Sequence, residues 1–383
     1  MRRPLRVLHI GNGNAFKIRA ITAGLAARGH EIHMAPVPPI PPAFSGVTWH
    51  ALPASPLPGR LGTLHRFFQM RQLAGRLCPD LVHAHNAWGP GWLGAATGVH
   101  PFIIHAYGGD FLPEQYGGRS ALQRALTSWA CRSADRVIVT GQHMRDAARH
   151  LNVDSDHVTV LPRGVDTKHF RPGLEVSALR RELNLADSTP VILSPRYQAD
   201  ESLYNLDIVI EAVAGLRQRF PRAVCLQLYD PVCQAGAARL QALAAAWGLG
   251  ESYRLVPAVD NAKMPLFYNL ADVTVSVPSS DGFPVTVLEA SACACPLVVS
   301  DLAYCEEWFT PRENGIIVPT RDAAALFGAL RELCADREFA GRLGTASRKL
   351  VIERADYDRC TDALESLYLD LTAKANIARP EIN

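Results

Sequence analysis

The sequence predicts an α/β protein made of two domains, each built on a parallel sheet. Three observations carry this prediction. The chain has 383 residues, more than the roughly 100–200 residues of one ordinary domain. Strand-like and helix-like segments alternate in both halves, as parallel sheets require. A turn-rich connector, 161–166 followed by 170–173, separates the two series.

In the first half, short apolar segments alternate with helical patterns from the N-terminus onward. The expected strands are Arg6–Ile10, Glu31–Pro36, Leu81–His85, Phe102–Ala106 and Arg136–Thr140, and the expected helices are Ala15–Arg28, Ser120–Ser133 and Gln142–His150.

The second half repeats this alternation and then becomes purely helical after Asp322. Its expected elements are 191–194, 206–219, 223–229, 237–247, 253–257, 264–270, 273–277, 285–293, 296–300 and 315–318. We therefore expect an N-terminal domain over 1–170, a C-terminal domain over 171–355, and a final helix in 356–383 that packs back toward the first domain.

Charge and cysteine count exclude several classes of protein. With 39 basic and 37 acidic residues the formal net charge is +2, whereas a nucleic-acid binder usually carries a strongly basic domain. The nine cysteines form no C-x-x-C pair, which argues against a disulfide framework or a zinc site. No stretch reaches the roughly 18 apolar residues of a membrane span, so we expect a cytoplasmic protein, free or at the inner face of the membrane.

One segment is locally basic. Between Arg60 and Arg76 four arginines and His65 alternate with apolar residues, at a spacing that suits a helix with one basic and one apolar face. A helix of this kind either makes a weak peripheral contact with an anionic membrane or lies solvated against the sheet. The second interpretation is the more ordinary one.

The first strand-to-helix turn contains Gly11, Asn12 and Gly13. It does not fit a dinucleotide-binding fingerprint, because Phe16 stands where the third glycine belongs and no carboxylate follows the next strand. The turn either exposes amides to a hydroxylated or anionic ligand or is a plain tight turn.

Histidines and an aspartate follow two neighbouring strands. His83 and His85 end one strand, while His105 ends the next and Asp110 follows it. Ligands of parallel sheets bind beyond the carboxyl ends of the strands, so His105 and Asp110 are candidates for hydrogen bonds to a sugar or phosphate. For His83 and His85 core packing is the better interpretation.

Arg196 opens the loop after the first strand of the second half. A guanidinium there can bind a diphosphate bidentately and neutralise its charge. The alternative is a surface arginine paired with Asp200 or Glu201.

The most specific segment runs from Ser279 to Cys293. A strand leads into a polar turn with Asp281, and an apolar helix then carries Glu289. A buried carboxylate is unfavourable unless it is hydrogen-bonded, so Glu289 needs a partner, either ribose hydroxyls or a protein group. The first amides of this helix point at whatever anion lies before them.

The spacing Asp281-x7-Glu289 resembles the E-x7-E motif of glycosyltransferase family 4. Its surroundings, Tyr268–Val273 before it and 298–301, 306–308 and 313–315 after it, are similar to the family pattern. The similarity extends to 28–31, 134–137 and 162–166, and so covers most of the chain.

This resemblance implies a GT-B fold, two Rossmann-like domains facing a cleft, and retaining transfer from a nucleotide-sugar to a glycan or lipid-linked acceptor without metal or cofactor. It implies catalytic roles for Asp281, Arg196 and His105, with the acceptor or interdomain cleft lined by Gly11, Asn12, Gly13 and Asp110. The donor-binding residues that it implies are Glu289, Gly282, Phe283, Pro284, Val285, Thr286, Val256 and Pro257.

Two positions depart from the family pattern. Asp281 replaces the usual glutamate, and Tyr204-Asn205 stands where the family has a lysine-glycine pair. The missing lysine favours one alternative, a non-catalytic GT-B subunit that binds nucleotide-sugar or acts as a scaffold. A GT-B sugar epimerase is the nearest alternative among enzymes. Both departures are similar to a bacterial subgroup of the family, so we expect an active transferase.

Overall fold

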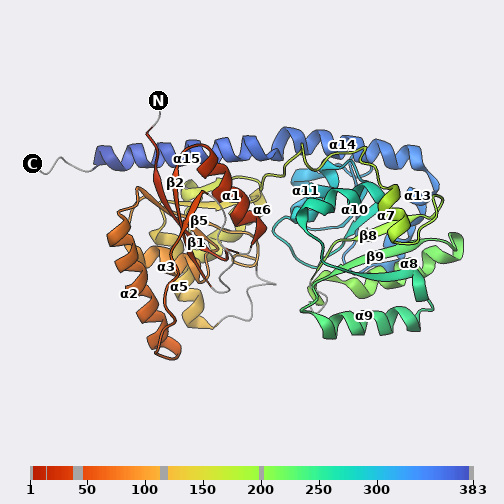
Figure 1. Ribbon diagram of the computed structural model, residues 1–383, viewed down its shortest axis with the longest axis horizontal. Helices are drawn as coiled ribbons and strands as arrows, with labels where there is room; N and C mark the ends of the chain where they lie inside the picture. The colour runs from red at the N-terminus through yellow and green to blue at the C-terminus, as the bar shows by residue number, and fades with distance from the viewer. Residues whose placement is uncertain (1–2, 14, 38–45, 113–119, 198–201, 379–383) are drawn as a thin grey trace, which may run out of the picture. The chain divides into compact units, whose positions relative to one another are not determined.

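The computed structural model describes residues 3–13, 15–37, 46–112, 120–197 and 202–378. Its contacts divide the chain into two compact units, Met1–Arg163 with Asp358–Asn383, and Gly164–Tyr357. The boundary expected after residue 170 falls inside the second unit instead, because Val165 and Phe170 belong to the core of that unit. Each unit is a Rossmann-like layer of parallel strands between helices, which confirms the predicted fold class (Figure 1).

The first unit contains a seven-stranded parallel sheet in the order β3-β2-β1-β4-β5-β6-β7. Two of its strands have three residues each, too few to show an alternation pattern in the sequence. The strands are β1 (Arg6–Gly11), β2 (Glu31–Pro36), β3 (Val47–Trp49), β4 (Leu81–His85), β5 (Phe102–His105), β6 (Arg136–Val139) and β7 (Val158–Val160).

Helices cover both faces of this sheet. On one face lie α1 (Phe16–Ala27) and the C-terminal helix α15 (Tyr357–Ala378), whose Leu364, Tyr368 and Leu371 pack in one core with strand residues (Figure 1). The other face is covered by α2 (Gly59–Leu77), α3 (Pro90–Thr97), α5 (Ala121–Ser133) and α6 (Gln142–Ala148). Within the described ranges, no helix is both long and apolar enough to cross a membrane.

The second unit contains a six-stranded parallel sheet in the order β10-β9-β8-β11-β12-β13. The adjacent strands β8 and β11 are central, so their carboxyl ends meet at one edge. The strands are β8 (Val191–Ser194), β9 (Val224–Tyr229), β10 (Tyr253–Pro257), β11 (Val273–Ser276), β12 (Leu297–Ser300) and β13 (Ile316–Val318).

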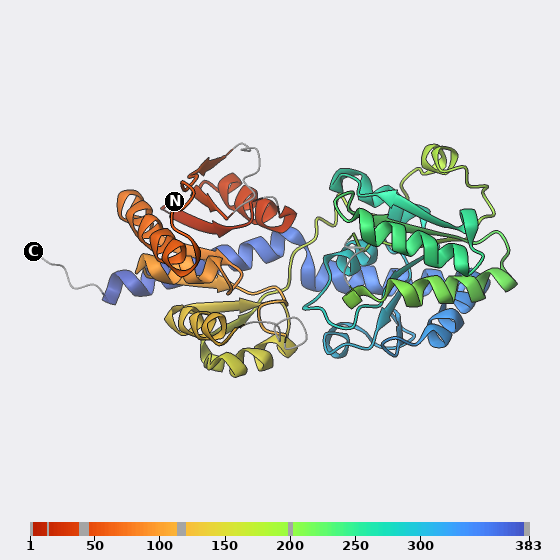
Figure 2. The same ribbon diagram turned by 90° about the horizontal axis from the view of Figure 1, so that it is seen from below.

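This second sheet is also covered on both faces, as Figure 2 shows. One core includes residues of α7 (Ser177–Glu182), α10 (Met264–Leu270), α11 (Val285–Ala292), α12 (Cys305–Trp308) and α14 (Arg337–Ala355). The other core includes residues of α8 (Leu206–Arg219), α9 (Gln234–Ala246) and α13 (Ala323–Ala335).

Candidate functional site

Three polar residues meet at the carboxyl edge of the second sheet. Arg196 follows β8, and its Nη2 lies 3.0 Å from Oδ2 of Asp281 and donates a 2.9 Å hydrogen bond to Oγ of Ser276. Ser276 is the last residue of β11, the strand beside β8. The alternative partners Asp200 and Glu201 lie outside the described residues. The structure therefore brings together two of the predicted catalytic residues, Arg196 and Asp281.

The Arg196 side chain is held in place from several sides and is only 11% exposed. Its guanidinium carbon lies 4.9 Å from the centre of the Tyr204 ring, and the buried Gln227 donates a 2.8 Å hydrogen bond to the Arg196 carbonyl oxygen. The buried Nε of Arg196 has no hydrogen-bond partner among the described residues. A buried donor without a partner is unfavourable, so a ligand anion that accepted from Nε would stabilise this arrangement.

Asn205 stands where the family pattern has a glycine, and it adopts the backbone conformation that glycine favours. Its φ is 50°, in the left-handed region that asparagine adopts more readily than most residues. Its amide nitrogen donates to the Val277 carbonyl and to Oγ of Ser279, each at 2.9 Å, and its amide oxygen accepts from Arg321. Asn205 thus keeps the backbone turn while it ties the start of α8 to the end of β11.

We expect Asn205→Gly to be more stable than Asn205→Ala. Both variants lose the same side-chain hydrogen bonds, but only alanine has a Cβ in a left-handed conformation, which costs about 1–2 kcal/mol. Urea unfolding of the two variants measures the difference. Equal stabilities would show that the left-handed backbone at residue 205 relaxes freely.

The turn after Asp281 places the start of α11 at the same edge. Oδ1 of Asp281 accepts from the Phe283 amide at 3.1 Å, and the buried Phe283 ring stacks on Trp308 with centroids 4.6 Å apart. Helix α11 begins at Val285, and no side chain caps its first turn. Oγ1 of Thr286 is buried and has no hydrogen-bond partner in the described part of the chain.

Gly282 and Pro284, also predicted to bind the donor, are buried within this turn. They shape the backbone rather than offering side-chain contacts, so the groups that remain for a ligand are the first amides of α11 and the Thr286 hydroxyl. Free amides at a helix N-terminus favour an anion.

Glu289 lies inside α11, and both of its carboxylate oxygens have protein partners. The Tyr268 hydroxyl donates to Oε2 at 2.8 Å, and the Asn261 amide donates to Oε1 at 3.2 Å. Burial, reinforced by the nearby carboxylate, raises the pKa of Tyr268 well above its usual range, so the phenol stays protonated and donates. The sequence required a partner for Glu289 and left open which one, and the structure supplies a protein partner from α10.

Val256 and Pro257, expected to line the base of the donor, end the edge strand β10. Pro257 is exposed and Val256 is partly buried. The short 3₁₀ turn Asn261–Lys263 follows them, so the connection between β10 and α10 also provides the Asn261 amide that reaches Glu289.

In the first unit the turn after β1 is shaped by packing. Gly11 and Gly13 are buried, while Asn12 is exposed. A Cβ added to Gly11 would lie 2.9 Å from Cβ of His85 and from Cδ1 of Ile18. Glycine is therefore needed here for close packing of the turn against β4, and the predicted contact of Gly11, Asn12 and Gly13 with a ligand stays a prediction.

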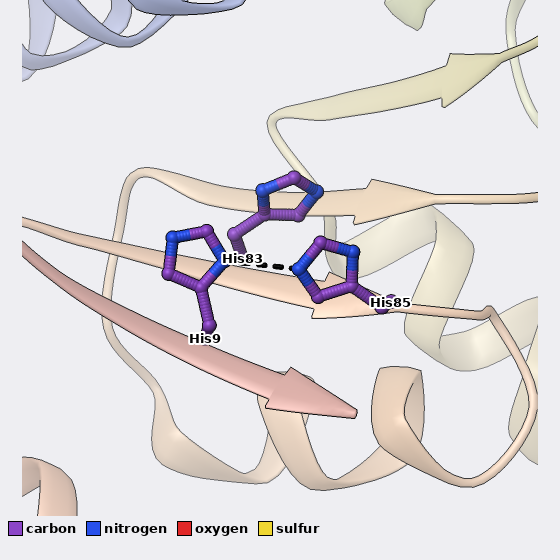
Figure 3. Close-up of side chains that lie close together, drawn as sticks. All are labelled: His9, His83 and His85. Atoms are coloured by element: carbon purple, nitrogen blue, oxygen red, sulfur yellow. Dashed lines mark hydrogen bonds between the residues drawn. The ribbon is translucent and has the colours of Figure 1, made fainter. Parts of the chain in front are cut away.

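Four buried histidines line the α15-facing side of the first sheet. Because side chains alternate along a strand, His83 and His85 of β4 share one face with His9 of β1 and His105 of β5. Nδ1 of His9 lies 2.9 Å from Nε2 of His85 (Figure 3).

Tyrosine hydroxyls fix the rings of two of these histidines. Nδ1 of His83 hydrogen-bonds the hydroxyl of Tyr368 on α15, and Nδ1 of His85 hydrogen-bonds the Tyr107 hydroxyl at 2.8 Å. The ring nitrogens of His9, His83 and His85 lie within 4.8 Å of one another, close enough for one metal ion to contact all three. Each of the three rings already uses a nitrogen within the protein, since Nδ1 of His9 bonds Nε2 of His85 and Nδ1 of His83 bonds Tyr368. The group therefore forms a hydrogen-bonded core without a metal ion.

His105 and Asp110 are also buried. The His105 ring stacks on Tyr107 with centroids 4.4 Å apart, and the Asp110 carboxylate accepts from the backbone amides of Tyr107 and Trp88 at 3.2 and 3.4 Å. Asp110 therefore organises the loop after β5. The catalytic contact of His105 and the cleft contact of Asp110 stay predictions.

We expect acid to destabilise the first unit through this cluster. Burial lowers the pKa of His9 to about 3, and burial together with neighbouring histidines lowers that of His83 well below 6.5. The unfolded chain therefore binds protons that the folded chain does not, and stability is complete above pH 6.5 and falls toward pH 3. From about pH 7.5 to pH 5, His9 alone removes roughly 2 kcal/mol.

Melting temperature against pH measures this effect. His9→Leu is expected to flatten the curve below pH 6.5, whereas His157→Gln, at an exposed position, leaves it as in the parent. Identical slopes for parent and His9→Leu would contradict a role of His9 in acid sensitivity.

Comparison with known proteins agrees with this architecture. A family model described as Glycosyltransferase Family 4 matches residues 16–169, and one described as Glycosyl transferases group 1 matches residues 176–350. The D-inositol 3-phosphate glycosyltransferase of Nocardia farcinica is 26% identical over 371 residues, which cover 87% of this chain and 79% of that protein.

Solved structures show the same fold at low identity. Sucrose-phosphate synthase from Thermosynechococcus elongatus has a TM-score of 0.83 at 21% identity and covers 97% of this chain and 100% of its own. Anabaena HepE in complex with UDP-glucose has a TM-score of 0.81 at 17% identity, and the match covers 96% of this chain and 100% of the HepE chain.

The two Rossmann-like units and these matches define a glycosyltransferase with the GT-B fold. The two family models together span nearly all of residues 16–350, and the chain belongs to glycosyltransferase family 4.

Proposed function

We propose that this glycosyltransferase moves a sugar, with retention of its anomeric configuration, from a nucleotide-sugar to a hydroxyl of a glycan, lipid-linked or small-molecule acceptor. The observation that carries the proposal is the buried Arg196, which is fixed at the carboxyl edge of β8 and keeps a buried Nε donor without a described partner. Open α/β sheets bind ligands at this edge. HepE, a protein of the same fold, has been solved with UDP-glucose.

In this proposal the second unit holds the donor. Arg196 and the first amides of α11 would bind the diphosphate, because a guanidinium and a helix N-terminus both stabilise phosphate charge. Asp281 would accept from hydroxyls of the sugar, and Glu289 would accept from the ribose after exchanging its hydrogen bond with Asn261. Val256 and Pro257 would lie beside the base.

The reaction step needs no protein nucleophile. The bond between the anomeric carbon and the diphosphate oxygen breaks, and the acceptor oxygen bonds to the same face of that carbon. The acceptor proton passes to the departing diphosphate, which leaves as a nucleoside diphosphate. Arg196 and the helix amides stabilise the charge that develops on that leaving group.

We also propose that transfer needs no metal or cofactor. The supporting observation is that a fixed cation, Arg196, and the uncapped start of α11 lie at the same sheet edge, where they would neutralise a diphosphate without a metal ion. The three close histidines belong to the first unit and are fully buried, away from solvent and from any diphosphate that approached from it.

Purified protein incubated with UDP-, GDP-, ADP- and dTDP-sugars tests the proposal. We expect one donor class to release its nucleoside diphosphate, slowly to water and faster with an acceptor, and chelator treatment to leave the rate unchanged. Release of an isomerised nucleotide-sugar would support the epimerase alternative. Folded protein that binds a donor but releases nothing with any acceptor would support the non-catalytic subunit.

A further inference from the structure

Helix α2 exposes three large apolar residues to solvent. Its buried residues are Gly62, Met70, Leu73 and Ala74, and the last three belong to the core that α2 shares with α3 and the sheet. Leu61, Leu64 and Phe68 are 58%, 60% and 59% exposed. The helix does lie against the sheet, as in the ordinary interpretation of the sequence, but these three apolar side chains face solvent.

The exposed apolar residues form one stripe. At about 100° per residue, Leu61, Leu64 and Phe68 fall within an arc of about 60°, and the exposed Leu57 precedes them one turn before Leu61. Single exposed apolar residues are ordinary, but a contiguous stripe of them marks an interaction surface. Figures 1 and 2 show α2, drawn in orange, at the periphery of the first unit.

The stripe is bordered by positive charge. On the same helical projection Arg60 and Arg71 lie on one side of the stripe and Arg76 on the other, and all three are exposed. Residues 32–79 contain no aspartate or glutamate, and in the described part of the chain the α2 arginines make no ion pair. The apolar stripe is therefore flanked by arginines on both sides, and no acidic residue of α2 or of the segment before it offsets their charge.

We infer that α2 docks on an anionic lipid bilayer, with its axis in the plane of the membrane. Leu61, Leu64 and Phe68 would enter the boundary between headgroups and acyl chains, and the flanking arginines would contact lipid phosphates. This combination of apolar centre and basic border is typical of interfacial helices. A nucleic acid would instead require the arginines at the centre of the contact.

The inference concerns binding and does not rest on the proposed transfer reaction. It does bear on that reaction, because an enzyme held at a bilayer meets acceptors that are anchored in lipid. A lipid-linked acceptor is thereby favoured over a freely soluble one.

Vesicle co-sedimentation of the full chain tests the inference. We expect the protein to pellet with vesicles of phosphatidylglycerol and phosphatidylcholine, much less with phosphatidylcholine alone, and less when salt is raised. Leu61→Ser/Leu64→Ser/Phe68→Ser and, separately, Arg60→Gln/Arg71→Gln/Arg76→Gln should each lower the partition coefficient at least about tenfold.

The matched control is Val232→Ser/Trp247→Ser, which changes two exposed apolar residues of the second unit and should bind vesicles as the parent does. Donor-induced thermal stabilisation should be unchanged in all three variants, which separates this test from that of the proposed function. Equal vesicle binding by the control and the apolar variant would overturn the inference. A second result would also overturn it: the parent binds no vesicles but forms a dimer, and the apolar variant is a monomer. The stripe would then bind a second copy of the chain.

Discussion

Arg196→Ala is expected to lower kcat by about 10²–10³-fold, the usual effect of removing one preorganised donor that stabilises developing charge. The guanidinium is nearly buried and held by Asp281, Ser276 and the Tyr204 ring, so it needs little reorganisation when charge moves onto the diphosphate. Steady-state kinetics with the donor identified by screening measures the change.

Two further variants make this prediction specific. Arg196→Lys keeps a positive charge but loses the planar fork that binds phosphate bidentately, so it should recover only part of the rate. Arg222→Ala, at an exposed position of the same unit, should leave kcat unchanged. An Arg196→Ala protein that is folded and retains the parent rate would refute the assigned role.

Glu289→Ala is expected to weaken donor binding about 10- to 100-fold, because a hydrogen bond to a charged group contributes about 1.5–3 kcal/mol. Glu289 is 5% exposed, and its carboxylate contacts Asn261 in the connection between β10 and α10. Val256 and Pro257 lie just before this connection, at the end of β10. Isothermal titration with the nucleoside diphosphate measures the loss.

Tyr268→Phe separates binding from folding at this position. The variant removes the hydroxyl that donates to Oε2 and leaves the carboxylate in place, so it should lower stability by about 1 kcal/mol with donor affinity kept within a few-fold of the parent. If both variants weakened donor binding equally, Glu289 would act only by holding α10 against α11.

The alternation of strands and helices made the fold predictable from the sequence. Buried central strands such as Leu81–His85 and Val191–Ser194 have the predicted bounds, because short, mostly apolar segments flanked by turns identify strands of parallel sheets. The three-residue strands β3 and β7 were not predictable, since their pairing is set by the neighbouring strand. The boundary near residue 170 failed for a similar reason, because Phe170 packs into a core formed by distant residues.

The sequence predicted which residues form the candidate site, but not which of their side chains contact one another. The spacing from Asp281 to Glu289 identified both carboxylates, yet only the adjacency of β8 and β11 shows that Arg196 faces Asp281 and Ser276. Ser276 could have been found from its place near the carboxyl end of the predicted strand 273–277.

Partners from more distant elements left no signal in the sequence. In the sequence Tyr204 is only a departure from the family's lysine. The structure alone shows that the Tyr204 ring lies against the Arg196 guanidinium. Asn261, Tyr268 and Gln227 lie in separate connections, and no local spacing relates them to Glu289 or Arg196.

The central claim is that the carboxyl edge of the second sheet binds a nucleotide-sugar, and hydrogen–deuterium exchange with and without nucleoside diphosphate tests it most directly. We predict slower exchange over residues 194–197, 276–289 and 256–268, with the protection lost in Glu289→Ala and no change in α2. Protection confined to other segments, with these three ranges unaffected while the ligand is bound, would contradict the claim.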